Sequence, residues 1–282
     1  MDSISSKNPK SLLKQYQARP SKRFGQNFLA DRGIVRKIVK AAEITSKDTV
    51  LEIGPGTGEL TKEITKTAGK VIAVEKDPRM VKILKESLGD AVNLKVVQGD
   101  IRRIDVRECG IKENNYKVVG NLPFYLTAPV IRRFLESEKP PSSMTLVVQK
   151  EVGQRICQKP PRMNLLAVSV QAYAEPKIIS YISKKSFWPQ PEVDAALIKI
   201  TPKGVPMGDT DLFFKIVKAG FSQPRKQLIN NLSKKLGVDK EKVGAWLEEN
   251  GIRPNQRAET LFIEDWLRLI ANYHIDNNSK RW

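Results

Sequence analysis

The stretch TVLEIGPGTGEL at residues 49–60 decides the fold. Its first half, TVLEIG (49–54), is an apolar run that predicts a buried strand, and a helical pattern follows from Leu60 onward. Between them, glycines at 54, 56 and 58 allow a tight turn and a close approach of the backbone to a ligand. This pattern is typical of nucleotide-binding α/β domains, although an ordinary strand-to-helix turn and a dinucleotide site remain alternatives.

Further apolar runs of strand length follow, and amphipathic helical patterns separate the first of them. They are KVIAVE (70–75), LKVVQG (94–99), YKVVGN (116–121) and MTLVVQ (144–149). This alternation predicts an α/β fold with a doubly wound, mostly parallel sheet. LLAVSVQAYA (165–174) and DAALIKI (194–200) are interpreted as late strands that pair antiparallel at the sheet edge.

The composition changes along the chain and predicts three parts. Residues 1–22 are expected to be a basic N-terminal arm, 23–202 the α/β domain, and 209–282 a small all-helical domain. The net charge is +18, and residues 1–40 alone hold ten Lys or Arg against two Asp or Glu. Such an excess suits a polyanionic partner, nucleic acid or an anionic surface, although a solvated basic arm would look the same.

Composition also argues against several kinds of chemistry. The only histidine is His274, and the two cysteines, Cys109 and Cys157, lie far apart. A metal site or a Ser-His-Asp triad has few residues to draw on, so neither is expected. Residues 1–30 carry charge throughout, and no apolar run reaches about 20 residues. We therefore expect a reduced, cytoplasmic protein without a membrane span.

Polar side chains lie at the ends of successive predicted strands. Glu75, Asp100 and Asn121 end the second, third and fourth strands, at the sheet edge where ligands bind in such folds. Glu75 suits two ribose hydroxyls, Asp100 suits an adenine amino group, and Gly54 leaves room for a methionine-like tail. NAD is a rival ligand, but no hydride-transfer partner stands near the strand ends, and helix capping is the alternative role for either acid.

The turn Asn121-Leu122-Pro123-Phe124 suggests chemistry on an adenine. The Asn121 side-chain oxygen and the Leu122 carbonyl can each accept one amino hydrogen and direct the nitrogen lone pair at a methyl donor. Pro123 stiffens the turn, and Phe124 can stack on the base, a contact worth about 1–3 kcal/mol. The alternative is a strand-ending Asn followed by a core Phe.

These stretches belong to a longer resemblance. From about Arg19 to Leu269 the chain resembles the small-subunit ribosomal RNA adenine dimethyltransferases, the KsgA-like family. The resemblance lies in KRFGQNFLAD (22–31), LEIGPGTGELT (51–61), VIAVEKD (71–77), QGD (98–100), GNLPF (120–124), QKEVGQR (149–155), FWPQPEVDAA (187–196), FSQPRKQLINNL (221–232) and RAETL (257–261). KRFGQNFL together with NLPF is highly specific, whereas GPGTG alone is not.

The resemblance implies a Rossmann-like class I methyltransferase domain that uses S-adenosylmethionine and releases S-adenosylhomocysteine, followed by a helical rRNA-binding domain. The implied donor site is Gln26, Asn27, Leu29, Gly54, Gly56, Glu75, Asp100, Ile101 and Asn121. The implied catalytic turn is Asn121, Leu122, Pro123 and Phe124, with Phe124 and Phe187 stacking on the target base. The implied RNA contacts are Lys22, Arg23, Lys150, Arg155, Arg225 and Lys226.

The implied reaction is dimethylation of each of two adjacent adenosines in a loop near the 3′ end of 16S rRNA. We expect a monomer that acts on a small-subunit precursor particle and contacts no membrane. The alternatives are the related 23S rRNA methyltransferases of macrolide resistance, disfavoured by FSQPRKQLINNL and RAETL, and a non-catalytic assembly factor, disfavoured by the complete donor set.

The chain departs from the family pattern in three places. Phe124 stands where Tyr is usual, which removes a hydroxyl but keeps the ring. Met163-Asn164-Leu165-Leu166-Ala167 replaces a usual Tyr-Gly-Arg-Leu-Ser, and Pro224-Arg225-Lys226 replaces a usual Arg-Arg-Lys. The last two affect the expected RNA contacts and leave the chemistry unchanged.

Overall fold

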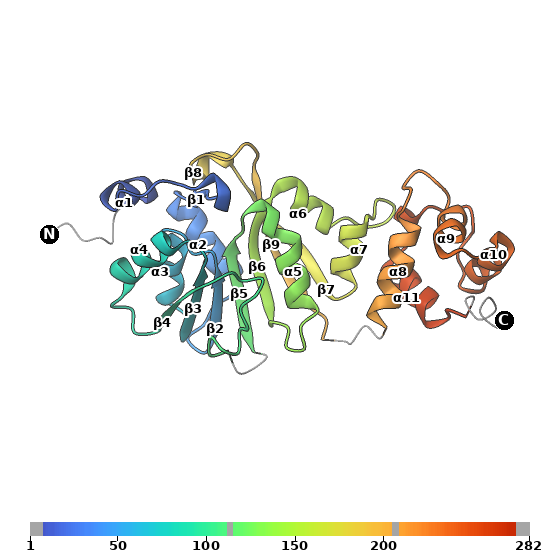
Figure 1. Cartoon of the computed structure of the whole chain (residues 1–282), viewed down its shortest axis with the longest axis horizontal. Helices are drawn as coiled ribbons and strands as arrows, with labels where there is room; N and C mark the ends of the chain where they lie inside the picture. The colour runs from blue at the N-terminus through green and yellow to red at the C-terminus, as the bar shows by residue number, and fades with distance from the viewer. Residues whose placement is uncertain (1–7, 112–114, 205–208, 275–282) are drawn as a thin grey trace. The chain divides into compact units, whose positions relative to one another are not determined.

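The chain forms two compact units in a computed structural model that describes residues 8–111, 115–204 and 209–274 (Figure 1). The first unit comprises Met1–Gln154 and Ala174–Lys203, and the second comprises Arg155–Tyr173 and Gly204–Trp282. The division expected from sequence differs in two respects: it assigned residues 155–173 to the α/β domain, and it treated residues 1–22 as a separate arm.

A seven-stranded sheet in the order β4-β3-β2-β5-β6-β9-β7 forms the centre of the first unit. Neighbours from β4 to β6 are parallel, and β9 runs antiparallel to both β6 and β7. The bounds are β2 Thr49–Ile53, β3 Lys70–Glu75, β4 Leu94–Gln98, β5 Tyr116–Asn121, β6 Ser143–Gln149, β7 Ala174–Ile182 and β9 Ala195–Pro202. The predicted α/β fold with a mostly parallel sheet is confirmed.

Five helices in the described part of the first unit follow strands: α2 follows the short strand β1 (Phe28–Leu29), and the other four follow the parallel strands β2, β3, β5 and β6. They are α2 Arg32–Ala41, α3 Glu59–Thr65, α4 Pro78–Leu88, α5 Thr127–Leu135 and α6 Lys150–Ile156. Asp31 caps α2 by accepting the N–H groups of Gly33 and Ile34. Asp77 caps α4 in the same way, with Pro78 at the first helical position, which suits its fixed φ.

The predicted N-terminal arm is partly structured. Residues 1–22 were expected to form a basic N-terminal arm, and within it Pro9–Gln15 form helix α1. Leu12 and Leu13 are almost fully buried and pack against α4. Two adjacent leucines in a polar segment are thus enough to dock a short helix. Residues 1–7 lie outside the described residues.

The segment after α1 lies beside the Pro-rich turn that follows β7. A 3₁₀ turn, η2 (Lys22–Phe24), leads into the short strand β1 (Phe28–Leu29). This strand pairs antiparallel with β8 (Phe187–Trp188), so that Leu29 lies opposite Phe187. Parts of the two sequence motifs KRFGQNFL and FWPQP therefore meet.

The second unit is helical and has its own core. Its elements are α7 Leu165–Gln171, α8 Thr210–Gly220, α9 Leu228–Leu236, α10 Lys240–Glu249, the 3₁₀ turn η5 Ala258–Thr260 and α11 Ile263–Ala271. Trp246, Trp266 and Phe213 are buried in its centre. Burial of such large side chains is the main stabilising contribution in a unit of this size.

One predicted strand in this part of the chain was wrong. Residues 165–174 were interpreted as a strand, but Leu165–Gln171 is helix α7 and strand β7 begins only at Ala174. The Asn164 side chain caps the helix by accepting the Ala167 N–H. Ala167, Val168 and Gln171 are buried at helical spacing, and this packing overrides the strand preference of the valines.

Candidate active site

One cavity of the first unit lies at the carboxyl ends of β2, β3, β4 and β5. Every residue of the predicted donor site lines it: Gln26, Asn27, Leu29, Gly54, Gly56, Glu75, Asp100, Ile101 and Asn121. The predicted base-holding residues also line it: Asn121, Leu122, Pro123, Phe124 and Phe187. The fold thus brings both predicted sets together, and their chemical roles stay predictions.

The glycine turn after β2 has the backbone that only glycine adopts readily. Gly54 and Gly56 have φ angles of 65° and 59°, in the left-handed region. A Cβ atom at Gly56 would lie 2.8 Å from the Phe28 ring, closer than van der Waals contact allows. The Gly56 N–H donates to Oε2 of Glu75 at 3.1 Å. This position therefore ties the glycine turn to the next strand.

Glu75 is a buried carboxylate at the end of β3. Burial raises its pKa, and hydrogen bonds from the Asp77 and Gly56 N–H groups partly offset that shift. The Asp77 N–H donates to Oε1 at 2.8 Å. The Lys76 N–H also acts on this carboxylate. Because a carboxylate can accept about four hydrogen bonds, Glu75 retains capacity for a ligand hydroxyl.

Asp100 is engaged by its neighbours. Arg102 donates to both oxygens, from Nε at 3.0 Å and from Nη2 at 2.6 Å, and Lys76 Nζ donates at 3.0 Å. The Arg102 guanidinium holds the pKa of Asp100 well below its usual range. An adenine amino group at Asp100 must therefore share the carboxylate with these cations or replace one of them.

Asn121 has a defined amide orientation. Its Nδ2 donates to the backbone carbonyl of Asn27 at 2.8 Å. A carbonyl oxygen only accepts, so this contact fixes which end of the amide is nitrogen. No described residue donates to its Oδ1, which lies on a cavity-lining side chain. The Leu122 N–H donates to the Val147 carbonyl at 3.1 Å and anchors the turn to β6.

The aromatic residues of the cavity differ in exposure. Phe124 is 38% exposed and Tyr125 50%, whereas Phe187 is only 6% exposed. Phe187 packs in a core cluster with Leu29 and Val147 as well as lining the cavity. The ring of Phe124 is thus open to an incoming base. Phe187 can offer a base only the part of its ring that faces the cavity.

The sequence interpretation missed Glu52 in strand β2. Glu52 is 1% exposed and lines the cavity, and neither of its oxygens has a hydrogen-bond partner among the described residues. Burial raises its pKa to about 8; the nearby Thr61 hydroxyl acts against this shift, and the charge of Glu75 adds to it. A charged residue inside the otherwise apolar run TVLEI is the signal that could have revealed it. An unpartnered buried carboxyl beside the cavity suits a cationic ligand.

A second acid, Glu59, also lines the cavity. Burial raises the pKa of Glu59 to about 7, and the Thr57 hydroxyl, which hydrogen-bonds its carboxylate, acts against the shift. The cavity therefore offers a glycine turn, a carboxylate for hydroxyls and acidic groups for a cation. These features fit the ribose and the amino-acid portion of S-adenosylmethionine.

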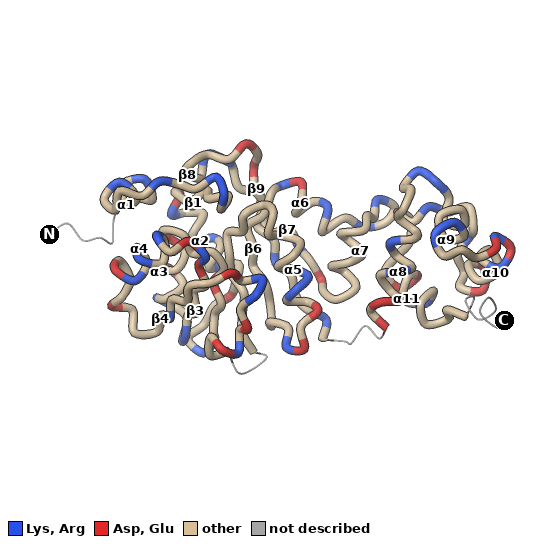
Figure 2. Tube along the Cα trace, in the orientation of Figure 1, with Lys and Arg blue, Asp and Glu red and all other residues tan. Residues whose placement is uncertain are grey.

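The predicted RNA contacts lie outside this cavity. Lys22, Arg23, Arg155, Arg225 and Lys226 are exposed, and Lys150 Nζ lies 5.3 Å from the centre of the Tyr181 ring. They belong to different units, and Figure 2 shows Lys and Arg in both, including helices α1 and α9. No helix in the described part of the chain is long and apolar enough to cross a membrane.

The fold and the cavity define a Rossmann-like, S-adenosylmethionine-dependent methyltransferase. Residues 17–274 match the family described as ribosomal RNA adenine dimethylase, and the chain belongs to that family. A relative from Dehalococcoides mccartyi, named ribosomal RNA small subunit methyltransferase A, is 41% identical over 94% of this chain and 92% of its own length.

Two solved structures resemble most of the chain. A dimethyladenosine transferase from Plasmodium falciparum matches with a TM-score of 0.75 and 25% identity, covering 87% of this chain and 97% of that one. The 23S rRNA methyltransferase ErmE matches with a TM-score of 0.70 and 27% identity, covering 89% and 100%.

Proposed function

We propose that the protein dimethylates the exocyclic amino group of two adjacent adenosines in the loop of a 3′-terminal hairpin of 16S rRNA. S-adenosylmethionine is the methyl donor and S-adenosylhomocysteine the product. We further propose that it acts in the cytoplasm, as a monomer, on a precursor of the small ribosomal subunit.

The orientation of the Asn121 amide supports this function most directly. With Nδ2 held by the Asn27 carbonyl, Oδ1 is the atom left to accept a hydrogen bond. An exocyclic adenine amine presents two hydrogens and delocalises its lone pair into the ring, so it needs acceptors that favour a more tetrahedral nitrogen. Oδ1 of Asn121 and the carbonyl of Leu122 are proposed as these acceptors.

The donor, when bound, supplies an electrophilic methyl group on a sulfonium. The chain's own residues then need to supply only geometry, because no metal or nucleophilic intermediate is required. Phe124 holds the base flat by stacking, and Pro123 stiffens the turn between the ring and the acceptors. After the first methyl transfer, one amino hydrogen remains, and the exposed side of the turn leaves room for the monomethylated nitrogen to rotate.

The donor itself is proposed to be held by the three carboxyls at the strand ends. Glu75 accepts a ribose hydroxyl with its remaining capacity, and Asp100 accepts the adenine amino group. Glu52, buried without a partner among the described residues, is proposed to pair with the donor's ammonium group. Such charge-assisted hydrogen bonds contribute about 1.5–3 kcal/mol each.

Two considerations favour the small subunit over the large one. The Dehalococcoides relative at 41% identity is named as a small-subunit enzyme, and the likeness to ErmE is lower, at 27%. The helical part, residues 209–282, is proposed to bind rRNA together with the arm at residues 1–22. The proposed contacts are Lys22, Arg23, Lys150, Arg155, Arg225 and Lys226. Because cationic side chains bind RNA by neutralising its phosphates, we expect rRNA binding to weaken strongly with added salt.

The test is methylation of undermodified ribosomal subunits with radiolabelled donor. We expect label in the small subunit, and mass analysis of the 3′-terminal rRNA fragment should find four added methyl groups. Label only in the large subunit would favour the ErmE-like reaction. Binding to the small subunit without any label would favour a non-catalytic assembly factor.

A further inference from the structure

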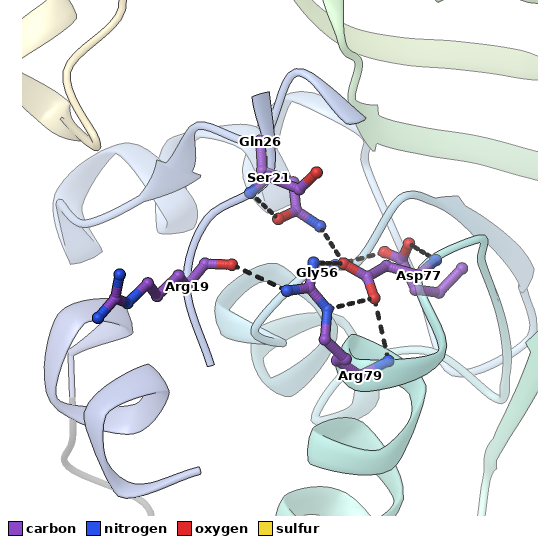
Figure 3. Close-up of polar contacts among 7 residues, drawn as sticks. Arg19, Ser21, Gln26, Gly56, Asp77 and Arg79 are labelled. Atoms are coloured by element: carbon purple, nitrogen blue, oxygen red, sulfur yellow. Dashed lines mark hydrogen bonds and ion pairs between the residues drawn. The ribbon is translucent and has the colours of Figure 1, made fainter. Parts of the chain in front are cut away.

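A single buried carboxylate, Asp77, joins two parts of the first unit (Figure 3). Asp77 is 1% exposed. Its Oδ1 accepts from the backbone N–H of Arg79 at 3.0 Å and from Arg79 Nε at 3.0 Å. Its Oδ2 accepts from Arg79 Nη2 at 2.6 Å and from Gln26 Nε2 at 2.9 Å. All four acceptor positions of the carboxylate are therefore used.

The contact with Gln26 fixes the segment that precedes β1. Oε1 of Gln26 accepts the Ser21 N–H at 2.8 Å, so the same side chain bridges its own segment and Asp77. Arg79 adds a second link, since Nη1 donates to the Arg19 carbonyl at 3.3 Å. Residues 19–26 are thus held to the start of α4 through Asp77 and its partner Arg79.

Helix capping accounts for only one of the two Asp77 oxygens. A cap needs one side-chain oxygen to accept an N–H of the first turn, and Oδ1 does this for Arg79. Oδ2 is not needed for the cap. It accepts a hydrogen bond from Gln26, which lies 51 residues away in sequence. Burying such a carboxylate is costly unless it is fully hydrogen-bonded, as it is here.

Asp77 contacts two cavity-lining residues and does not line the cavity itself. Its side chain holds Gln26 and its backbone N–H holds Glu75, and both of these side chains line the cavity. We propose that Asp77 is a positioning residue. Its carboxylate holds the Gln26 side chain in the place where Gln26 helps to bind the methyl donor. The proposal rests on the proposed function, because it presumes that this cavity binds S-adenosylmethionine.

The chain contains a matched control for this arrangement. Asp105 and Arg107 repeat it, with Oδ1 accepting the Arg107 N–H at 2.9 Å and Oδ2 accepting Nη2 at 2.8 Å. The Asp105 side chain is 35% exposed, and among the described residues no distant segment donates to it. The local pair thus forms without any function in the cavity, so burial and the link to Gln26 are what distinguish Asp77.

The decisive variant is Asp77→Asn, because Asn preserves the cap through Oδ1 while its Nδ2 faces two other donors, Gln26 Nε2 and Arg79 Nη2. Calorimetry should find S-adenosylhomocysteine bound about tenfold more weakly, as expected when one charge-assisted hydrogen bond is lost. Asp105→Asn should bind it within about twofold of the wild type. Trypsin should also cut faster after Lys22 and Arg23 in Asp77→Asn, because these residues lie in the segment that Asp77 holds through Gln26.

A double-mutant cycle separates positioning from general destabilisation. If Asp77 acts through Gln26, then Asp77→Asn combined with Gln26→Ala should bind S-adenosylhomocysteine no more weakly than the weaker single variant. Fully additive losses, or unchanged affinity in Asp77→Asn, would overturn the proposal. Wild-type protein that binds S-adenosylhomocysteine but methylates no rRNA would instead contradict the proposed function and leave this test intact.

Discussion

The two halves of the cavity are built from opposite kinds of residue. We assign the half at the ends of β2 to β4 to the methyl donor and the half after β5 to the target base. The donor half contains the carboxyls of Glu52, Glu75 and Asp100, mostly buried and mostly hydrogen-bonded. The base half, after β5, presents aromatic rings, with Phe124 38% and Tyr125 50% exposed. A small, charged donor can be surrounded by a pre-formed polar site. A base attached to a large RNA has to be met by a surface that is reachable from outside.

Asn121 lies where the two halves meet, and its loss should have the largest effect. Asn121→Ala removes the proposed acceptor for the amino group and the hydrogen bond to the Asn27 carbonyl. We expect kcat for rRNA methylation to fall about a hundredfold or more, as when a pre-organised donor or acceptor is removed from other active sites. Single-turnover kinetics with saturating donor would measure it.

Asn93→Ala is a suitable control for that variant. Asn93 Nδ2 also donates to backbone carbonyls, those of Thr65 and Ala68, but Asn93 does not line the cavity. We expect it to lower stability and to leave kcat nearly unchanged. An Asn121→Ala enzyme that methylates at the wild-type rate would rule out the proposed role of the amide.

Phe124→Ala tests the base half alone and should have the next largest effect. Base stacking contributes about 1–3 kcal/mol, so kcat/KM for rRNA should fall by about tenfold to a hundredfold. The affinity for S-adenosylhomocysteine should stay within about twofold, because the ring lies in the half of the cavity that we assign to the base. A loss of donor affinity as large as the loss of kcat/KM would show that the two halves are not separate.

The sequence predicted which strand-end residues meet in one cavity, because their positions follow from the fold. Once strands alternate with helices, the glycine turn and the residues that end each strand must lie at one edge of the sheet. Glu75, Asp100 and Asn121 were predicted in this way, and all three line the same cavity. The aromatic, Pro-rich stretch at residues 187–191 and the resemblance both pointed to Phe187, but neither predicted its pairing with Leu29.

What the sequence did not reveal depends on packing between distant segments. Helix α1 docks through Leu12 and Leu13, which are buried in a cluster with Met80 and Ile83 of α4 and Phe28 of β1. Residues 165–171 carry valines that suit a strand, and the core of the second unit makes them helical. The buried state of Glu52 likewise depends on neighbours that its own strand does not specify.

The pH dependence of donor binding tests the charges of the donor half. The pKa of Glu52 is raised to about 8, so its carboxyl is mostly protonated at pH 7 in the absence of donor. A cationic donor favours the ionised form, and its binding should release a proton. We expect donor affinity to rise by up to about tenfold between pH 7 and pH 9 and to lose most of this rise in Glu52→Gln. Calorimetry in buffers of different ionisation enthalpy measures the released proton.

The raised pKa of Glu52 also makes the stability of the folded protein depend on pH. Stability should fall with rising pH, whereas donor affinity should rise. A raised pKa means that the folded state holds the proton more tightly than the unfolded state. Protonated Glu52 therefore makes its full contribution to the free energy of unfolding below pH 4.5, the ordinary pKa of the group. That contribution is lost as the pH rises through about 8. Glu52→Gln should raise the free energy of unfolding at pH 9 by roughly a few kcal/mol. Denaturant unfolding of the variant and the wild type at pH 5 and pH 9 measures this difference. A variant that is less stable than the wild type at both pH values would contradict the prediction.

Phe124→Tyr should have the smallest effect and sharpens the comparison most finely. The ring is 38% exposed, so a hydroxyl at its edge can reach water and carries little desolvation cost. If stacking is the task of the ring, the face is unchanged, and kcat/KM for rRNA should stay within about threefold. Phe124→Ala and Phe124→Tyr together separate the face of the ring from its edge. A change of more than tenfold in Phe124→Tyr would mean that the base half, too, depends on a polar contact, and the contrast between the two halves would no longer hold.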